Sequence, residues 1–113
     1  MHIERAITTH ILNLSSGMPI PGIAVTLHKK SHPKTLYSAV TNQDGRITAW
    51  NQALELSTGI WELNFATSDW FKQQEQEYFF DDVALAFKIH DIHRDYHIPL
   101  LLNFYGYSTY RGS

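Results

Sequence analysis

Short stretches in which apolar and polar residues alternate recur along this chain, and they limit the folds that it can adopt. The clearest runs from 83 to 89, where Val83, Leu85, Phe87 and Ile89 alternate with smaller or charged residues. Successive side chains of a strand point to opposite faces, so a period of two predicts half-buried β-strands. Similar segments cover 7–13, 23–28, 36–41, 47–50 and 60–66, and two more lie within 96–113.

Turn signals separate these segments and set the fold class. Gly17 and Pro19 mark one turn, and Asp44-Gly45 is a strong tight-turn signal directly before Arg46. A chain of 113 residues has the size of one domain with a single core, so we expect one domain over 1–113. Seven to eight short strands with one short helix predict an all-β antiparallel β-sandwich.

The helix is expected to begin at Ser68. Serine is a favourable N-cap, and Asp69 follows in the first turn, where the helix dipole favours an acid. Two turns are too few for a helix to be stable alone, so this one must dock on the sheets. We interpret the acidic residues after it as a solvated face rather than as acid–base groups: Glu75, Glu77, Asp81 and Asp82.

Composition excludes several classes of partner. The formal net charge is −2 and no run of Lys or Arg is present, so we do not expect nucleic-acid binding. The absence of cysteine excludes disulfides and thiolate chemistry and fits a reducing cytosol. No apolar run approaches the roughly 20 residues of a membrane span, and residues 1–6 lack the apolar core of a signal peptide, so we expect a cytoplasmic protein that does not bind membranes.

The segment 96–113 is the most apolar and aromatic part of the chain. Left in water it would form a sizeable exposed apolar patch, so we expect it to be packed. It also carries the imidazole of His97, the guanidinium of Arg111 and the hydroxyl of Ser113. A packed segment with this much polar chemistry is expected to be part of a site.

Three further positions carry chemistry on the predicted strands. His10 lies mid-strand, on the face that it shares with Thr8 and opposite Ile7 and Ile11. Arg46 directly follows a turn, and His97 enters a strand. A single mid-strand histidine is more often structural than catalytic. A site therefore requires that these residues converge with Arg111 and Ser113, which spacing does not show.

Two alternatives for the polar residues are not favoured. Offsets of three and seven would place His90, His93 and His97 on one face of a helix, but the segment from His90 to Asp95 reads as a loop, and no zinc motif is present. Ser113 is not part of a GxSxG nucleophile elbow. We therefore expect no metal site and no serine nucleophile.

Four segments resemble the motifs of the 5-hydroxyisourate hydrolases, the transthyretin-like enzymes of urate breakdown. They are residues 8–12, Asp44-Gly45-Arg46, residues 96–101 and Tyr110-Arg111-Gly112-Ser113. The resemblance spans about 7–113 and is most specific in the C-terminal tetrapeptide. It implies a prealbumin-like β-sandwich and a homotetramer, a dimer of dimers with active sites in grooves where two dimers meet.

The resemblance also implies the activity and its residues. The reaction is hydrolysis of 5-hydroxyisourate to 2-oxo-4-hydroxy-4-carboxy-5-ureidoimidazoline, without metal or organic cofactor. His10, Arg46, His97 and Ser113 are implied as catalytic residues, and His10, Arg46, Tyr110 and Arg111 as substrate-binding residues. One histidine is expected to activate water and the other to bind or protonate, and the sequence does not decide which.

The chain departs from the family pattern at three places. Asp81 follows Phe79-Phe80 where proline is common, Asp95 replaces the first histidine of a His-Tyr-His triplet, and 103–105 replaces a Ser-Pro-Phe-like stretch. No matched catalytic residue is lost. The alternatives are a non-catalytic transthyretin-type carrier of a small aromatic ligand and an interaction β-sandwich without a ligand. Neither needs His10, Arg46 and His97 together.

Overall fold

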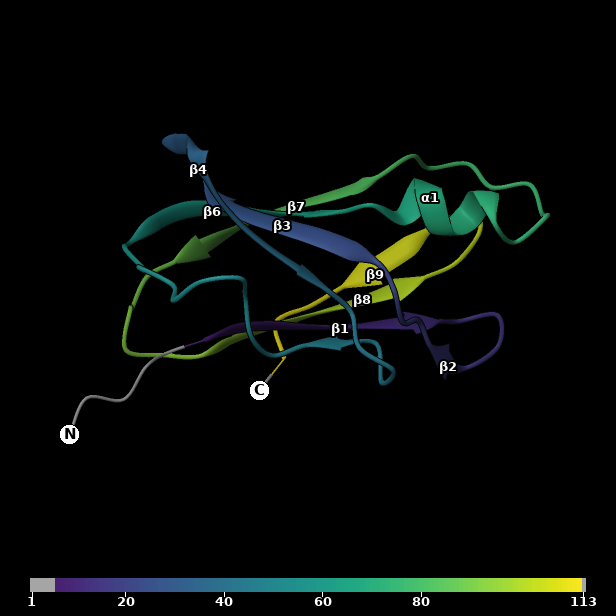
Figure 1. The fold of residues 1–113 in the computed structure, drawn as a ribbon, viewed down its shortest axis with the longest axis horizontal. Helices are drawn as coiled ribbons and strands as arrows, with labels where there is room; N and C mark the ends of the chain where they lie inside the picture. Colours follow the sequence, from purple (N-terminus) through teal and green to yellow (C-terminus); the bar gives the residue numbers. More distant parts are fainter. Residues whose placement is uncertain (1–5, 113) are drawn as a thin grey trace.

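The chain folds into two sheets that pack face to face, as a computed structural model shows for residues 6–112 (Figure 1). The first sheet contains β1 (Ile7–Asn13), β2 (Met18–Pro19), β5 (Arg46–Ile47), β8 (Tyr96–Leu102) and β9 (Tyr107–Thr109). The second contains β3 (Ala24–Lys29), β4 (His32–Val40), β6 (Gly59–Phe65) and β7 (Val83–Ile89). One helix, α1 (Thr67–Lys72), follows β6. The predicted β-sandwich with one short helix is confirmed.

The strand order brings distant parts of the chain together. The first sheet runs β2-β1-β8-β9, with β5 also paired to β1, and the second runs β4-β3-β6-β7. The pair β1–β8 is parallel, whereas the other pairs between these strands are antiparallel. A parallel pair needs a long crossover. Here the chain between β1 and β8 makes that crossover, and it includes all four strands of the second sheet.

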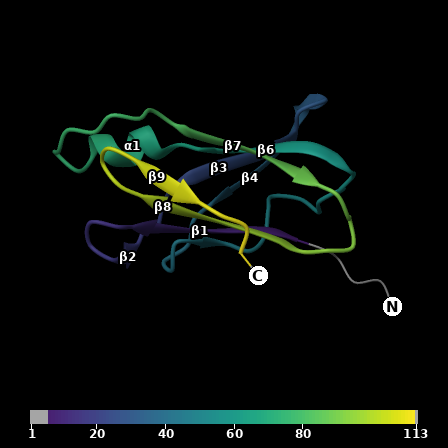
Figure 2. The ribbon, with the colours of Figure 1, turned by 180° about the vertical axis from the view of Figure 1, so that it is seen from behind.

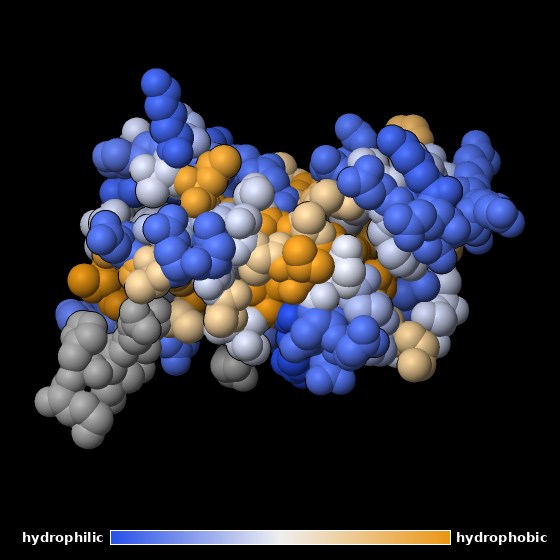
Figure 3. Space-filling view, viewed as in Figure 1, coloured by the Kyte–Doolittle hydropathy of each residue, from blue (hydrophilic) through white to orange (hydrophobic). Residues whose placement is uncertain are grey.

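The predicted alternation places the core between the two sheets. Ile7, Thr9 and Ile11 of β1 are buried, and on β6 the predicted inward residues Trp61, Leu63 and Phe65 are at most 2% exposed. Each fully buried large apolar side chain contributes about 1.5–3 kcal/mol to folding. The alternate residues of β1 and β6 face outward and are at least partly exposed. Figure 3 shows apolar surface over the middle of the sandwich, between hydrophilic groups at its two ends.

The start of the helix differs from the prediction. Its N-cap is Ala66 without a side-chain cap, and Ser68 lies inside the first turn, so the prediction of Ser68 as N-cap was wrong. Asp82 Oδ1 instead accepts hydrogen bonds from the backbone N–H (3.1 Å) and hydroxyl (2.7 Å) of Ser68. An acid from the segment before β7 thus satisfies a helix donor that a local cap would have satisfied. The predicted docking is confirmed, since Phe71 is buried.

The predicted strand over 47–50 is also shorter than expected. It ends at Ile47, and the indole N–H of Trp50 donates to the backbone carbonyl of Ile7 at 2.8 Å. A side chain therefore satisfies a β1 carbonyl beyond the short ladder that β5 forms with β1. Within residues 6–112, no helix has the length and apolar character needed to cross a lipid bilayer.

Candidate active site

His10 and Arg46 lie opposite each other on neighbouring strands. They are register partners of the antiparallel pair β1–β5, and their side chains share the outer face of the first sheet. The turn before β5 fixes this arrangement. Gly45 has φ +70°, and a Cβ there would lie 2.6 Å from the carbonyl oxygen of Ile11, so the close turn requires glycine.

His97 reaches the same outer face from the other side of β1. The parallel register pairs Thr8 with His97, and Thr8 Oγ1 lies 2.8 Å from His97 Nδ1. His10 pairs with Pro99, two residues further along β8. The two histidines are therefore diagonal neighbours, offset by about 6–7 Å along the strands. The structure brings His10, Arg46 and His97 together, as the hypothesis of a site requires.

The charges of this cluster act on His97. Burial lowers the pKa of His97 below its ordinary value, and the positive charge of Arg46 and, to a lesser degree, that of His10 lower the pKa further. Each of these causes disfavours the imidazolium. These causes together favour the neutral form of His97.

The C-terminal segment leaves β9 and passes β8 (Figure 1), where Gly112 pairs with His97 in continuation of the antiparallel β8–β9 register. The backbone N–H of Gly112 donates to the carbonyl of His97 at 2.7 Å. A Cβ at position 112 would lie 2.6 Å from Cδ2 of the His97 ring. Real Cβ contacts are not this short, so the ring and the tail backbone touch only because residue 112 is glycine. Tyr110, between β9 and Gly112, is exposed.

Arg111 points away from this cluster. Its guanidinium carbon lies 5.4 Å from the centre of the Tyr96 ring, a cation–π contact. Tyr96 is buried, and it is the neighbour of His97 on β8, so the two side chains lie on opposite faces. Arg111 therefore attaches the tail to the inner side of the sheet. Ser113 lies outside the described residues.

Two residues of the site had no role in the sequence analysis beyond their position in a motif. Thr8 was placed on the His10 face by alternation, but its contact with His97 depends on the parallel register. Gly112 was part of the tetrapeptide, and its glycine requirement follows from the His97 ring.

The loop before β8 carries His90, His93 and Asp95. His90 and His93 are exposed in the loop before β8, where His93 N–H bonds to Asp91. Across residues 6–112, no three His, Cys, Asp or Glu side chains gather where they could hold a metal ion. Asp95 accepts a hydrogen bond from the backbone N–H of Ala6 at 3.0 Å, beside the start of β1.

Comparison with known proteins shows the family of this chain. Residues 7–112 match the HIUase/Transthyretin family. The chain belongs to this family. It is 38% identical over 112 residues to the 5-hydroxyisourate hydrolase of Salmonella dublin, covering 97% of this chain and 82% of that one.

Solved structures of the HIUase/Transthyretin family have the same fold. The 5-hydroxyisourate hydrolase of Klebsiella pneumoniae superposes with a TM-score of 0.82 at 38% identity, over 95% of this chain and 98% of that chain. Transthyretin from Sparus aurata superposes with a TM-score of 0.80 at 20% identity, over 94% and 95% of the two chains. The second likeness shows the fold alone.

Proposed function

We propose that this chain is an enzyme that hydrolyses 5-hydroxyisourate to 2-oxo-4-hydroxy-4-carboxy-5-ureidoimidazoline, a step of urate degradation. The observation that carries the proposal is the cluster of His10, Arg46 and His97 on one face of the first sheet. Relatives that this chain matches over nearly its whole length bear the name of this activity. A transthyretin-type carrier shares the fold but has no use for a neutral histidine beside a guanidinium.

His97 is assigned the role of general base. Ring opening at an acyl C–N bond needs water from which a proton is removed as it attacks. An ordinary histidine, with a pKa of about 6.5, is already partly neutral at pH 7. Burial, Arg46 and His10 lower the pKa of His97 and so enlarge its neutral fraction.

Arg46 is assigned the stabilisation of the developing oxyanion. Its side chain is exposed on the outer face, free to approach a flat substrate rich in carbonyl groups. Guanidinium offers a planar fork of donors that matches such groups, and donors aimed at developing charge lower the barrier directly. The same charge disfavours protonation of His97, so one residue serves both steps.

His10 lies between these two groups and is assigned substrate binding and proton donation to the leaving nitrogen. It is register partner of Arg46 and diagonal neighbour of His97. With His97 as the base, the second imidazole is the remaining titratable group of the cluster that can return a proton.

The tail is proposed to close one side of the pocket. Gly112 lies against the His97 ring, and Tyr110 is exposed on the approach. The contact of Arg111 with Tyr96 favours a tail-fixing role over direct substrate contact. Ser113 is proposed to contribute its hydroxyl. No cofactor is required for this chemistry, and we propose the cytoplasm as its compartment, which a chain without cysteine fits.

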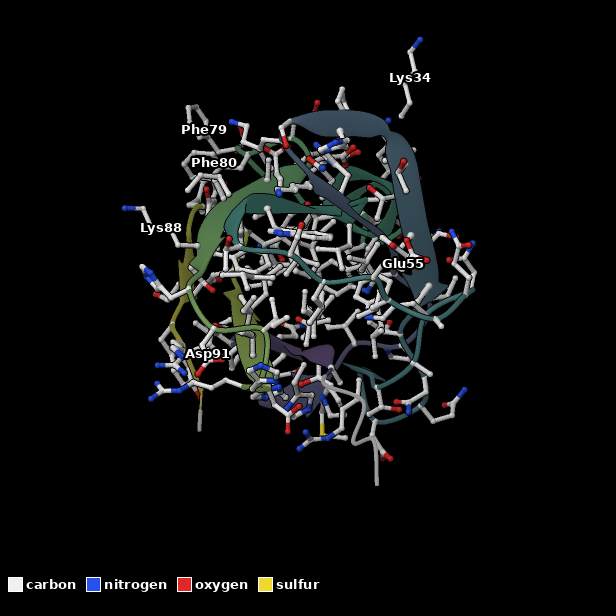
Figure 4. The ribbon with its side chains drawn as sticks, turned by 90° about the vertical axis from the view of Figure 1, so that its left-hand side faces the viewer. Lys34, Glu55, Phe79, Phe80, Lys88 and Asp91 are labelled. Carbon is white, nitrogen blue, oxygen red and sulfur yellow. The ribbon has the colours of Figure 1, made fainter. Side chains whose placement is uncertain are left out.

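A homotetramer built as a dimer of dimers is also proposed. β7 and β9 are edge strands on the same side of the sandwich (Figure 2). A groove of about 770 Å³ runs between them and is lined by half-buried Leu85 and Phe87. Figure 4 shows Phe79, Phe80 and Lys88 projecting from this side, opposite Lys34 and Glu55. Open edges beside exposed aromatics support pairing with a second copy.

A direct assay tests the activity. 5-Hydroxyisourate is generated freshly from urate, and its ultraviolet absorbance is followed with and without the protein. We expect decay faster than the spontaneous reaction, in proportion to protein concentration. Decay at the spontaneous rate would overturn the proposed function and favour a carrier.

A further inference from the structure

The His97 ring is held by contacts at two of its edges. Thr8 Oγ1 occupies the Nδ1 side at 2.8 Å, and it is the hydrogen-bond partner of this ring among residues 6–112. Gly112 covers the Cδ2 and Cγ side, where an added Cβ would stand 2.6 and 3.3 Å away. The remaining ring nitrogen, Nε2, has no hydrogen-bond partner among residues 6–112 and is therefore the candidate contact for a water molecule.

The partner at Nδ1 is a neutral hydroxyl, and its chemistry differs from that of a carboxylate. A carboxylate in this position stabilises the imidazolium, as in serine-protease triads. A threonine hydroxyl has one donor and two acceptor lone pairs and adds no charge. It fixes the orientation of the ring without favouring protonation, in agreement with the lowered pKa of His97.

The hydrogen bond also persists through the reaction. When neutral His97 accepts a proton at Nε2, its Nδ1 carries a hydrogen, which Thr8 Oγ1 accepts. After Nε2 takes the proton from water, Nδ1–H remains and still donates to the same oxygen. No hydroxyl rotation is needed between the two states.

We propose that Thr8 is a positioning residue, which holds neutral His97 in its Nδ1–H tautomer and leaves Nε2 as the proton acceptor. The proposal rests on the proposed function for its reaction, whereas the tautomer is a property of the protein alone. Thr8 is held in register with His97 by the β1–β8 ladder, so a strand and not a loop sets the contact.

The decisive variants are Thr8→Val and Thr8→Ser. Valine keeps the branched shape on the strand but removes the hydroxyl, and serine keeps the hydroxyl. We expect Thr8→Val to lower kcat by about 10- to 100-fold, the loss typical when the hydrogen-bond partner of a metal-ligating histidine is removed, with KM little changed. Thr8→Ser should retain most of the activity. Thr26→Val, at a half-buried threonine on the outer face of the other sheet, serves as the matched control.

A second measurement reports the ring itself. Nitrogen-15 NMR of the full chain, with His97 assigned through His97→Gln, is expected to show the Nδ1–H tautomer in the unsubstituted protein and a shift toward Nε2–H in Thr8→Val. If Thr8→Val unfolds, Thr8→Ala replaces it, and the tautomer of His97 in that variant is compared with the tautomer in the unsubstituted protein.

Three results would overturn the proposal: a neutral His97 that carries its proton on Nε2, a Thr8→Val variant with unchanged kcat and tautomer, or a Thr8→Ser variant as impaired as Thr8→Val. Failure of the proposed function is distinct, because the unsubstituted protein would then not accelerate decay while the NMR comparison still reports the ring.

Discussion

Gly112 lies so close to the imidazole of His97 that a single added carbon would stand 2.6 Å from Cδ2 of that ring. The backbone N–H of the same glycine donates to the His97 carbonyl at 2.7 Å, so the tail has little freedom to withdraw. This contact connects the C-terminal motif to a proposed catalytic group and leads to the first prediction.

Gly112→Ala is expected to impair activity while leaving the fold intact. The added methyl group must displace the ring or the tail, and a displacement of about 1 Å can cost about 10²-fold in rate. Steady-state kinetics and a thermal melt check this. The control is Gly106→Ala, since nothing lies within 4 Å of a Cβ at position 106. Full activity in Gly112→Ala would mean that the tail does not hold the ring.

Arg46→Ala is expected to lower kcat by about 10²–10³, the loss typical for one oxyanion donor. Arg46→Lys should recover only part of this, because an ammonium lacks the planar fork. Since Arg46 is exposed, stability should change by less than about 0.5 kcal/mol. Lys34→Ala, at an exposed residue on the far side, is the control. An unchanged rate in Arg46→Ala would remove this residue from the mechanism.

The pH dependence of kcat/KM should report His97. The base must be unprotonated, and its pKa is lowered by burial, Arg46 and His10, so the acidic limb should fall below the ordinary histidine value of about 6.5. Arg46→Ala removes a positive charge, which raises the pKa of His97 and should move the limb to higher pH. A limb at or above the ordinary value in the unsubstituted protein would contradict the assignment of His97 as base.

Neighbouring acids before β7 should differ in their effect on stability. Asp82 accepts two hydrogen bonds from Ser68 in the first turn of α1, so Asp82→Ala should cost about 1 kcal/mol, as loss of a helix cap does. Asp81 is exposed, and its backbone carbonyl rather than its side chain bonds to Thr67. Asp81→Ala should therefore be nearly neutral. Thermal melts at one protein concentration compare the two, and equal midpoints would show that Asp82 does not act as a cap.

Phe79→Arg should weaken assembly. Phe79 is 73% exposed and contacts Phe80, which in turn contacts Tyr107 of edge strand β9. A charge introduced here resists burial against a second copy. Light scattering coupled to size-exclusion chromatography should show a lower mass than for the unsubstituted chain. Leu36→Arg, at an exposed residue of β4, should leave the mass unchanged. Identical masses for both variants would place the interface elsewhere.

Alternation was sufficient to predict most strands, because burial between two sheets imposes the same period of two on both. It predicted that Trp61, Leu63 and Phe65 face inward, and that His10 and Thr8 share the opposite face from Ile7. It overestimated the strand after Arg46, since a tryptophan side chain replaces the backbone ladder there. The helix start was wrong because its cap comes from Asp82, 14 residues after Ser68.

The spacing of residues along the chain could not predict that the site residues lie close together. The neighbourhood of His10 and His97 depends on β1 and β8 lying side by side in parallel, and no local signal specifies which strands pair. The resemblance named the three residues but not Thr8, whose role is visible only once the register is known.

The pairing of β1 with β8 has a further consequence for biosynthesis. The hydrogen bond between Thr8 and His97 joins residues that are 89 positions apart in the chain. A nascent polypeptide emerging from the ribosome therefore contains His10 and Arg46 long before His97 has been synthesised. Contacts of such high sequence separation form late and slowly. Catalytic competence should thus arise only after nearly the whole chain has been synthesised, so that prematurely terminated products would be inert.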